Sequence, residues 1–296
     1  VLELRSLTRK YYDLTDERSA HINKLKGDLH TVFPQYLDVF CDVTGKTSTM
    51  ILRQYGTPDK ILRGHKKTMI EKISKASRKG LAKASERYEK LCAAANAAKT
   101  FGCQIDSIYF NIFLTLDLVE KLDSALDSIL NRIRQLITFN KNEKFIQQIK
   151  LLNTIPGVGF LTAVTIMCEI GDFSAFRNPK QLFAYFGLDP EVNESGKFVG
   201  TQLHMSKRGS RIARRAIFAV ALASIRTKRN GEGINPYLRK YYELKSGQKP
   251  KMVAIGAVMH KVCNIVFAVL RDEKAFELRS PEEHCKQYQR PALAAA

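Results

Sequence analysis

The segment 205–221 places basic side chains around the start of an amphipathic helix, an arrangement that could bind an anion. Ser210 is a residue type favoured at a helix N-cap. Arginines directly after such a cap oppose the helix dipole, so they cost stability unless an anion lies nearby. We therefore predict a phosphate site at this helix start. Its candidate ligands are Ser206, Lys207, Arg208, Arg211, Arg214 and Arg215.

A second candidate phosphate site is the sequence Ile-Pro-Gly-Val-Gly at 155–159, which separates two apolar, helix-like segments. Glycines at both positions would let the turn bend sharply and bring backbone N–H groups against a phosphate. The pattern is typical of a helix-hairpin-helix, whose DNA contacts would be Gly157, Gly159 and Thr162. The alternative is an ordinary glycine turn.

The residues present disfavour a DNA glycosylase and reject a P-loop. DNA glycosylases with a similar turn carry a nucleophilic lysine where this chain has Leu161, and no iron–sulfur cysteine cluster follows. Gly45-Lys46-Thr47 is not a P-loop, because the first glycine of that motif would fall at Phe40.

Between the two candidate phosphate sites, Ser195 is followed by a glycine and by Lys197. A serine-glycine pair by itself usually marks a turn. A serine hydroxyl becomes a nucleophile only beside a base or metal, with positive groups to stabilise the charge on the reacting phosphate. The basic residues of 205–215 could supply that charge, and Lys197 is a weaker candidate for the same DNA-binding role.

The overall charge supports an anionic partner. The 296 residues contain 48 lysines and arginines against 29 aspartates and glutamates, a net charge of +19. The excess is concentrated in two windows: 51–100 has 13 basic and 4 acidic residues, and 201–250 has 12 and 2. A face that serves only solubility mixes both signs, so these windows favour binding to nucleic acid.

These candidate sites must be positioned mainly by helices, because glycine and proline are scarce and the apolar spacing is helical. We expect a mostly α fold, with a helical and coiled-coil region at 1–144 and a compact helix-hairpin-helix domain at 145–296. Helices are expected at 4–32, 46–55, 58–63, 66–99 and 105–136. The last has a heptad seam, which fits a helix buried within one chain as well as an intermolecular coiled coil. The seam positions are Ile105, Ile108, Ile112, Thr115, Val119, Leu122, Leu126, Ile129, Ile133 and Leu136.

No membrane-spanning segment or disulfide framework is expected. The most apolar stretch, 252–270, is interrupted by His260 and Lys261, and the six cysteines never approach a CxxC spacing. We therefore expect a cytoplasmic protein without a membrane partner.

Taken in order, several segments resemble the carboxy-terminal transposase domain of the "one-ten" insertion-sequence family. Members are bridge-RNA-guided, DEDD-type recombinases related to the Piv DNA invertase. The segments are 151–171, Phe-Ala-Tyr-Phe-Gly-Leu-Asp-Pro at 183–190, Glu-Ser-Gly-Lys at 194–197 and Met-Ser-Lys-Arg-Gly at 205–209. The amino-terminal half is similar to the helical and coiled-coil linker of the same proteins.

The resemblance implies that Ser195 is the nucleophile that joins covalently to a DNA 5′ phosphate. It also implies DNA as substrate, a guide RNA as partner and a homo-oligomer through the seam at 105–136. Complete members begin with a RuvC-like domain whose four acidic residues bind Mg²⁺, and this chain is expected to begin just after it and to lack that metal site. Its own candidates Asp13, Asp16, Glu169 and Asp172 are interpreted as surface or helix-end carboxylates.

The functional expectation is therefore a component of a DNA transposase, inactive without the acidic domain. The alternative is a non-enzymatic nucleic-acid-binding module, such as a truncated transposase acting as regulator or assembly partner. A structural coiled-coil scaffold would leave the Ser-Gly motif and the arginines unexplained.

The charge distribution makes a first prediction about salt dependence. If six to ten phosphates are neutralised, affinity for nucleic acid should fall by about 10³ to 10⁵ between 50 and 200 mM salt, because bound counterions are released. Filter binding across this range measures the effect. Affinity that does not change with salt would contradict the electrostatic interpretation.

Overall fold

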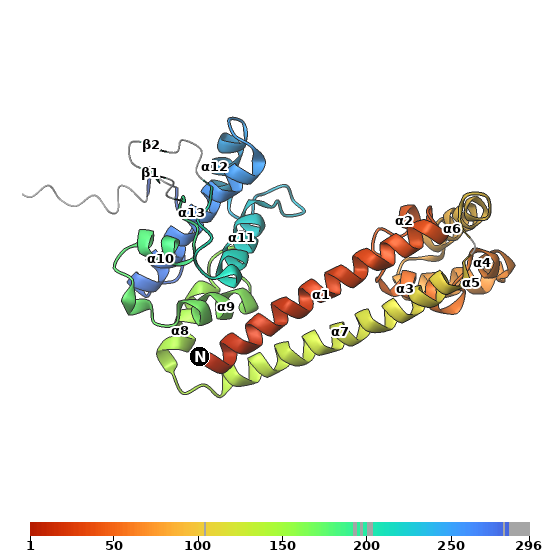
Figure 1. Ribbon diagram of the computed structural model, residues 1–296, viewed down its shortest axis with the longest axis horizontal. Coiled ribbons are helices and arrows are strands. Elements are labelled where there is room, and N and C mark those ends of the chain that lie inside the picture. The colour runs from red at the N-terminus through yellow and green to blue at the C-terminus, as the bar shows by residue number, and fades with distance from the viewer. Residues whose placement is uncertain (104, 192–193, 196–197, 200–203, 281, 284–296) are drawn as a thin grey trace, which may run out of the picture. The chain divides into compact units, whose positions relative to one another are not determined.

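The computed structural model describes residues 1–103, 105–191, 194–195, 198–199, 204–280 and 282–283. The described chain is mostly helical, as the sequence predicts (Figure 1). It forms two compact units, residues 11–131 and residues 1–10 with 132–296. The domain boundary predicted at residue 144 lies where the helical pattern of the sequence is interrupted. The boundary between the two units in the structure instead falls inside two long helices.

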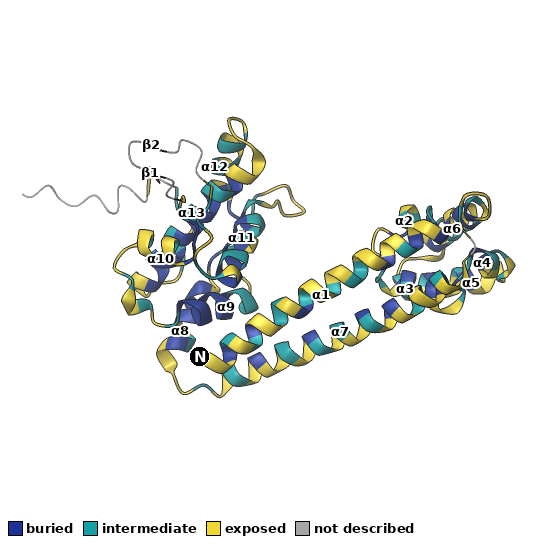
Figure 2. Cartoon of the chain, in the orientation of Figure 1, coloured by how far each residue is buried: buried dark blue, intermediate teal, exposed yellow. Residues whose placement is uncertain are grey.

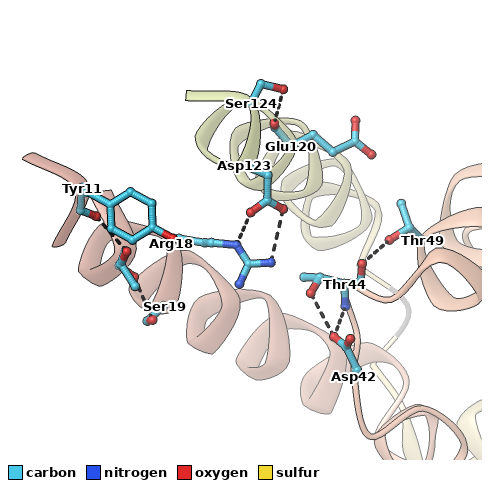
Figure 3. Close-up of polar contacts among 10 residues, drawn as sticks. Tyr11, Arg18, Ser19, Asp42, Thr44, Thr49, Glu120, Asp123 and Ser124 are labelled. Carbon is cyan, nitrogen blue, oxygen red and sulfur yellow. Dashed lines mark hydrogen bonds and ion pairs between the residues drawn. The ribbon is translucent and has the colours of Figure 1, made fainter. Parts of the chain in front are cut away.

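Those two helices are α1 (Leu2–Val32) and α7 (Asp106–Thr138). Within the 11–131 unit they run antiparallel and side by side (Figure 1). Figure 3 shows the Arg18 guanidinium of α1 donating to both carboxylate oxygens of Asp123 on α7. Nearer the end of α1, the Tyr109 hydroxyl donates to the carbonyl of Val32 at 3.5 Å. The range of α1 confirms the predicted helix over 4–32.

Short helices fill the chain between α1 and α7. The predicted basic helix over 66–99 is in fact two helices, because the backbone turns at Arg78, whose φ is +53°, and the next helix begins after Gly80. The predicted helices near 46–55 and 58–63 are confirmed. The bounds are α2 Tyr36–Val39, α3 Lys46–Gln54, α4 Pro58–Arg63, α5 Lys66–Ser77 and α6 Leu81–Phe101.

One apolar core joins these helices to α1 and α7. Leu25 and Leu29 of α1 lie in the same buried cluster as Ile112 and Leu116 of α7. Figure 2 shows buried positions along both helices. The ring of Tyr36 is also fully buried, and its hydroxyl lies 2.9 Å from the hydroxyl of Ser48. Several seam positions are therefore buried within one chain. The buried members are Ile112, Thr115, Val119, Leu126 and Ile133.

The other unit packs its helices around α13 (Lys251–Asp272), which contacts α8, α10, α11 and α12. Among the described residues, α13 is one helix that is long and apolar enough to cross a membrane, but 56% of its most apolar window is buried inside the protein. A core helix has these properties too. The other elements are α8 Glu143–Leu152, α9 Phe160–Ile170, η1 Phe173–Ala175, α10 Pro179–Tyr185, β1 Glu194–Ser195, β2 Phe198–Val199, α11 Arg211–Ile225 and α12 Pro236–Ser246.

The burial pattern of α7 predicts different costs for two neighbouring positions. Ile112→Ala should lower the free energy of unfolding by about 2–5 kcal/mol, because it leaves a cavity in the core. Leu114→Ala, on the same helix but 49% exposed, should change it by less than about 0.5 kcal/mol. Urea denaturation of both variants measures the difference, and equal costs would contradict the assigned core.

Candidate nucleic-acid interface

The predicted glycine turn at 155–159 joins α8 to α9 and is fixed against α11. Gly157 has a φ of +97°, and a Cβ there would lie 2.9 Å from the hydroxyl oxygen of Ser224. Ser224 is buried, and its hydroxyl donates to the carbonyl of Pro156 at 3.0 Å. Gly157 is therefore required by both its backbone conformation and the close approach of α11.

Gly159 has a different role. It is the N-cap of α9 with an extended backbone that any residue could adopt, and a Cβ there would meet nothing within 4 Å. No side chain caps the helix, and its first turn, which includes the half-buried Thr162, contains no acidic residue. Open space beside a positive helix end fits an anion, so Gly159 and Thr162 remain predicted phosphate contacts.

Two backbone segments cross in direct contact where α10 ends. A Cβ on Gly187, whose φ is +65°, would lie 2.4 Å from the nitrogen of Gly209, and a Cβ on Gly209 would lie 2.0 Å from the carbonyl of Tyr185. Next to this crossing, the backbone N–H of Lys207 donates to the Gly187 carbonyl at 3.0 Å. Lys207 itself has a positive φ of +54°. Only glycine permits such an approach.

The same crossing anchors the loop that carries Ser195. The hydroxyl of Ser206 donates to the Asp189 carboxylate at 2.6 Å, and Pro190 pairs with Met205 in an isolated antiparallel bridge. Farther along the loop, the backbone of Ser195 pairs antiparallel with that of Phe198 in the short β1–β2 sheet. The side chain of Ser195, and all of Lys197, lie outside the described residues.

The basic helix start is built as predicted at its cap. The Ser210 hydroxyl oxygen accepts a hydrogen bond from the backbone N–H of Ala213 at 3.1 Å, which confirms Ser210 as the N-cap of α11. Lys207, Arg208 and Arg211 are exposed, and Arg215 is half-buried. Arg211 and Arg215 also make contacts within the protein.

Arg214 is engaged within the protein. Its guanidinium donates to the carbonyl of Phe186 at 3.1 Å and to that of Gly209 at 2.8 Å, so it binds both sides of the backbone crossing. Burial lowers its pKa. Among the predicted phosphate ligands, Arg214 and Ser206 therefore hold the crossing together, while Arg208 and Arg211 face solvent.

The sequence analysis missed the role of Glu169, a buried carboxylate near the end of α9. Its two oxygens accept from the Arg9 guanidinium at 2.8 and 2.9 Å, and its side chain also hydrogen-bonds with Ser210. Burial raises the pKa of Glu169, but the hydrogen bonds from Arg9 and Ser210 and the nearby positive charges lower it by more, so the pKa lies below its ordinary value. Glu169 is thus a helix-end carboxylate, as predicted, but it is buried.

Glu169 changes the argument about the basic helix start. Because it bonds to the N-cap of α11, the protein itself supplies an anion beside the arginines, which offsets part of their unfavourable interaction with the helix dipole. The sequence signal for this pairing is a single acidic residue within an apolar segment. Such a residue is expected to be buried, and a buried carboxylate needs a paired cation.

The residues that the structure describes contain no group of three or more His, Cys, Asp or Glu side chains placed to hold a metal ion. The described residues therefore do not fit a Mg²⁺ site.

The turn at 155–159, the anchored loop and the basic helix start all lie within one helical unit. Residues 149–243, which cover all three, match the family described as Transposase IS116/IS110/IS902 family. Residues 149–243 are thus similar to this family, and the resemblance found in the sequence is confirmed.

Similar proteins extend the comparison beyond that domain. The chain is 24% identical over 282 residues, 94% of its length, to the insertion element IS110 uncharacterized 43.6 kDa protein of Streptomyces coelicolor. It is 30% identical over 177 residues, 60% of its length, to the pilin gene-inverting protein of Moraxella bovis. It is 26% identical over 188 residues, 62% of its length, to the transposase for insertion sequence element IS1111A of Coxiella burnetii. The chain spans 65%, 52% and 50% of the lengths of these three relatives.

The buried ion pair predicts a pH-dependent loss of stability. Arg9→Ala should lower the free energy of unfolding by about 1–3 kcal/mol at neutral pH, because it leaves the Glu169 carboxylate short of a hydrogen-bonding cation. Since the folded-state pKa is depressed, the pair stabilises the fold above the ordinary glutamate pKa of about 4.3, and its contribution is lost as pH falls. The difference from wild type should therefore shrink on acidification.

Urea denaturation at several pH values measures both effects. Lys10→Ala is the matched control, since Lys10 is the exposed neighbour on the same helix. A pH-independent cost of Arg9→Ala would show that the loss is one of packing.

Proposed function

We propose that this chain is the DNA-handling part of a transposase or recombinase that mobilises an insertion sequence. The observation that carries the proposal is the family match over 149–243, because that segment holds the hairpin, the Ser195 loop and α11 in one unit. Two relatives support it by their names, a transposase and a gene-inverting protein.

In this proposal Ser195 is the nucleophile. Its oxygen attacks a backbone phosphorus, a bond from serine to the 5′ phosphate forms, and the bond to the 3′ oxygen breaks, so that the 3′ oxygen leaves with a proton as a hydroxyl. The phosphodiester energy is retained in the protein–DNA bond, and rejoining needs no nucleotide. The loop supports this role, because its stem at 189–190 and 205–206 is held by a hydrogen bond and a backbone bridge, and the serine follows farther along the loop.

The basic side chains have separate tasks in this scheme. Arg208 and Arg211 are exposed at the start of α11, where they can contact DNA phosphates. The open N-terminus of α9, with Gly159 and Thr162, would hold the backbone at a second point. We further propose that a guide RNA binds the complete protein and that Mg²⁺ is held by the acidic domain expected from the family. We also propose that two copies associate through the seam at 105–136, at those of its positions that are not buried within the chain.

Ser195→Ala tests the chemistry. In a preparation that includes the acidic domain and cleaves its DNA, this variant should form no covalent protein–DNA adduct, while its affinity for DNA stays within about two-fold of wild type, because a neutral hydroxyl contributes little to phosphate binding. Arg211→Ala should instead weaken binding. Denaturing gels detect the adduct and mass spectrometry maps it.

The control is Ser246→Ala, at the end of α12 and outside the loop, which should leave adduct formation unchanged. An adduct recovered from Ser195→Ala and mapped to another residue would contradict the assignment.

A further inference from the structure

The turn between α5 and α6 gathers cations on the 11–131 unit, which is separate from the transposase domain. Residues 72–83 contain five basic residues and no acidic one. All five are exposed. They are Lys72, Lys75, Arg78, Lys79 and Lys83.

Other cations of the same basic window are partly neutralised by ion pairs. Lys90 lies 2.8 Å from the Glu86 carboxylate, and Lys99 lies 2.6 Å from that of Asp59. Within the part of the chain that the structure describes, the four cations at 75, 78, 79 and 83 make no ion pair. The structure thus divides the window into paired cations along α6 and a turn where the positive charge is unbalanced.

The turn has a defined conformation. The Ser74 hydroxyl donates to the carbonyl of Lys79 at 2.9 Å, and the Lys79 N–H donates to the Ser77 hydroxyl oxygen at 3.3 Å. With Arg78 in the left-handed region, these bonds bring cations from the end of α5 and the start of α6 together. Like charges held close repel each other, and a polyanion relieves that repulsion.

A groove of about 760 Å³ between α5 and α6 adjoins this turn. Lys66 and Lys67 contribute to it from α5, and Leu81, 60% exposed, contributes from α6. Its remaining lining residues are His65, Ile70, Glu71, Ala82 and Ser85. Exposed cations spread over two helices and a groove match an extended chain of phosphates better than one small anion.

We propose that the α5–α6 turn and this groove form a second nucleic-acid contact, which binds the phosphodiester backbone of DNA or RNA. The inference rests on the proposed function in that a recombinase must hold nucleic acid. It assigns that contact to a unit outside the matched family segment, so the 11–131 unit is more than a spacer.

The test replaces Lys75, Arg78, Lys79 and Lys83 by glutamine in the 296-residue chain. The matched control replaces the same number of exposed lysines on α1, α3 and α7 of the same unit, namely Lys24, Lys26, Lys46 and Lys121. Both variants lose four positive charges, so a difference between them reports position and not net charge. All eight side chains are exposed, and circular dichroism checks that both variants fold.

Fluorescence anisotropy with a labelled DNA duplex and a labelled RNA hairpin, across a range of salt, provides the readout. The turn variant should bind at least one of them about ten-fold or more weakly, and its salt slope should fall by about one for each phosphate that the turn no longer neutralises. The arm with the larger loss of affinity identifies DNA or RNA as the partner. The control should change far less.

Equal behaviour of the turn variant and the control in both arms would overturn the inference. The readout is equilibrium affinity and involves no cleavage, so that result would contradict this surface alone. Failure of the Ser195 experiment would contradict the proposed function instead.

Discussion

The close crossing of two backbone segments at Gly187 and Gly209 is the constraint on which the candidate site depends. A Cβ at either glycine would lie closer to the backbone of the other segment than van der Waals contact allows. Because the segments touch, Arg214 can bind carbonyls on both sides, and Ser206 can reach Asp189. The crossing therefore fixes both the base of the serine loop and the first residues of α11.

The positive charge at the start of α11 is offset in part inside the protein. Glu169 reaches the N-cap serine of α11 from the end of α9, and Arg9 from α1 holds its charge. Arg5 makes a second contact between α1 and α9, since its Nε donates to the carbonyl of Cys168 at 2.6 Å. A cation near the last carbonyls of a helix is favourable, so the first turns of α1 stabilise the carboxyl end of α9.

The cations of the two basic windows, 51–100 and 201–250, lie on different units and differ in how many are engaged within the protein. In the window 201–250, Arg214 is engaged with backbone carbonyls, whereas Lys207, Arg208 and Arg211 near it are exposed. In the window 51–100, ion pairs occupy several cations along the helices and leave the α5–α6 turn unbalanced. Net charge alone does not distinguish these cases, because it counts an engaged guanidinium and an exposed one equally.

The sequence by itself determined the helical class, the long helix from Leu4 to Val32, the Ser210 cap and the transposase resemblance. Each depends on local spacing or on residue order, and local hydrogen bonding and periodicity act over a few residues. It could not give the break at Arg78, where a non-glycine residue adopts a positive φ.

Only the tertiary structure decided which predicted ligands are available. The roles of Glu169, Arg214 and Ser206 arise from partners 160, 28 and 17 residues away in the chain, and such pairings leave no periodic signal. The same reason explains the seam of α7, since a heptad pattern specifies that a face is buried but not which helix buries it. Five seam positions are buried, and one of them, Ile112, lies in the core shared with α1.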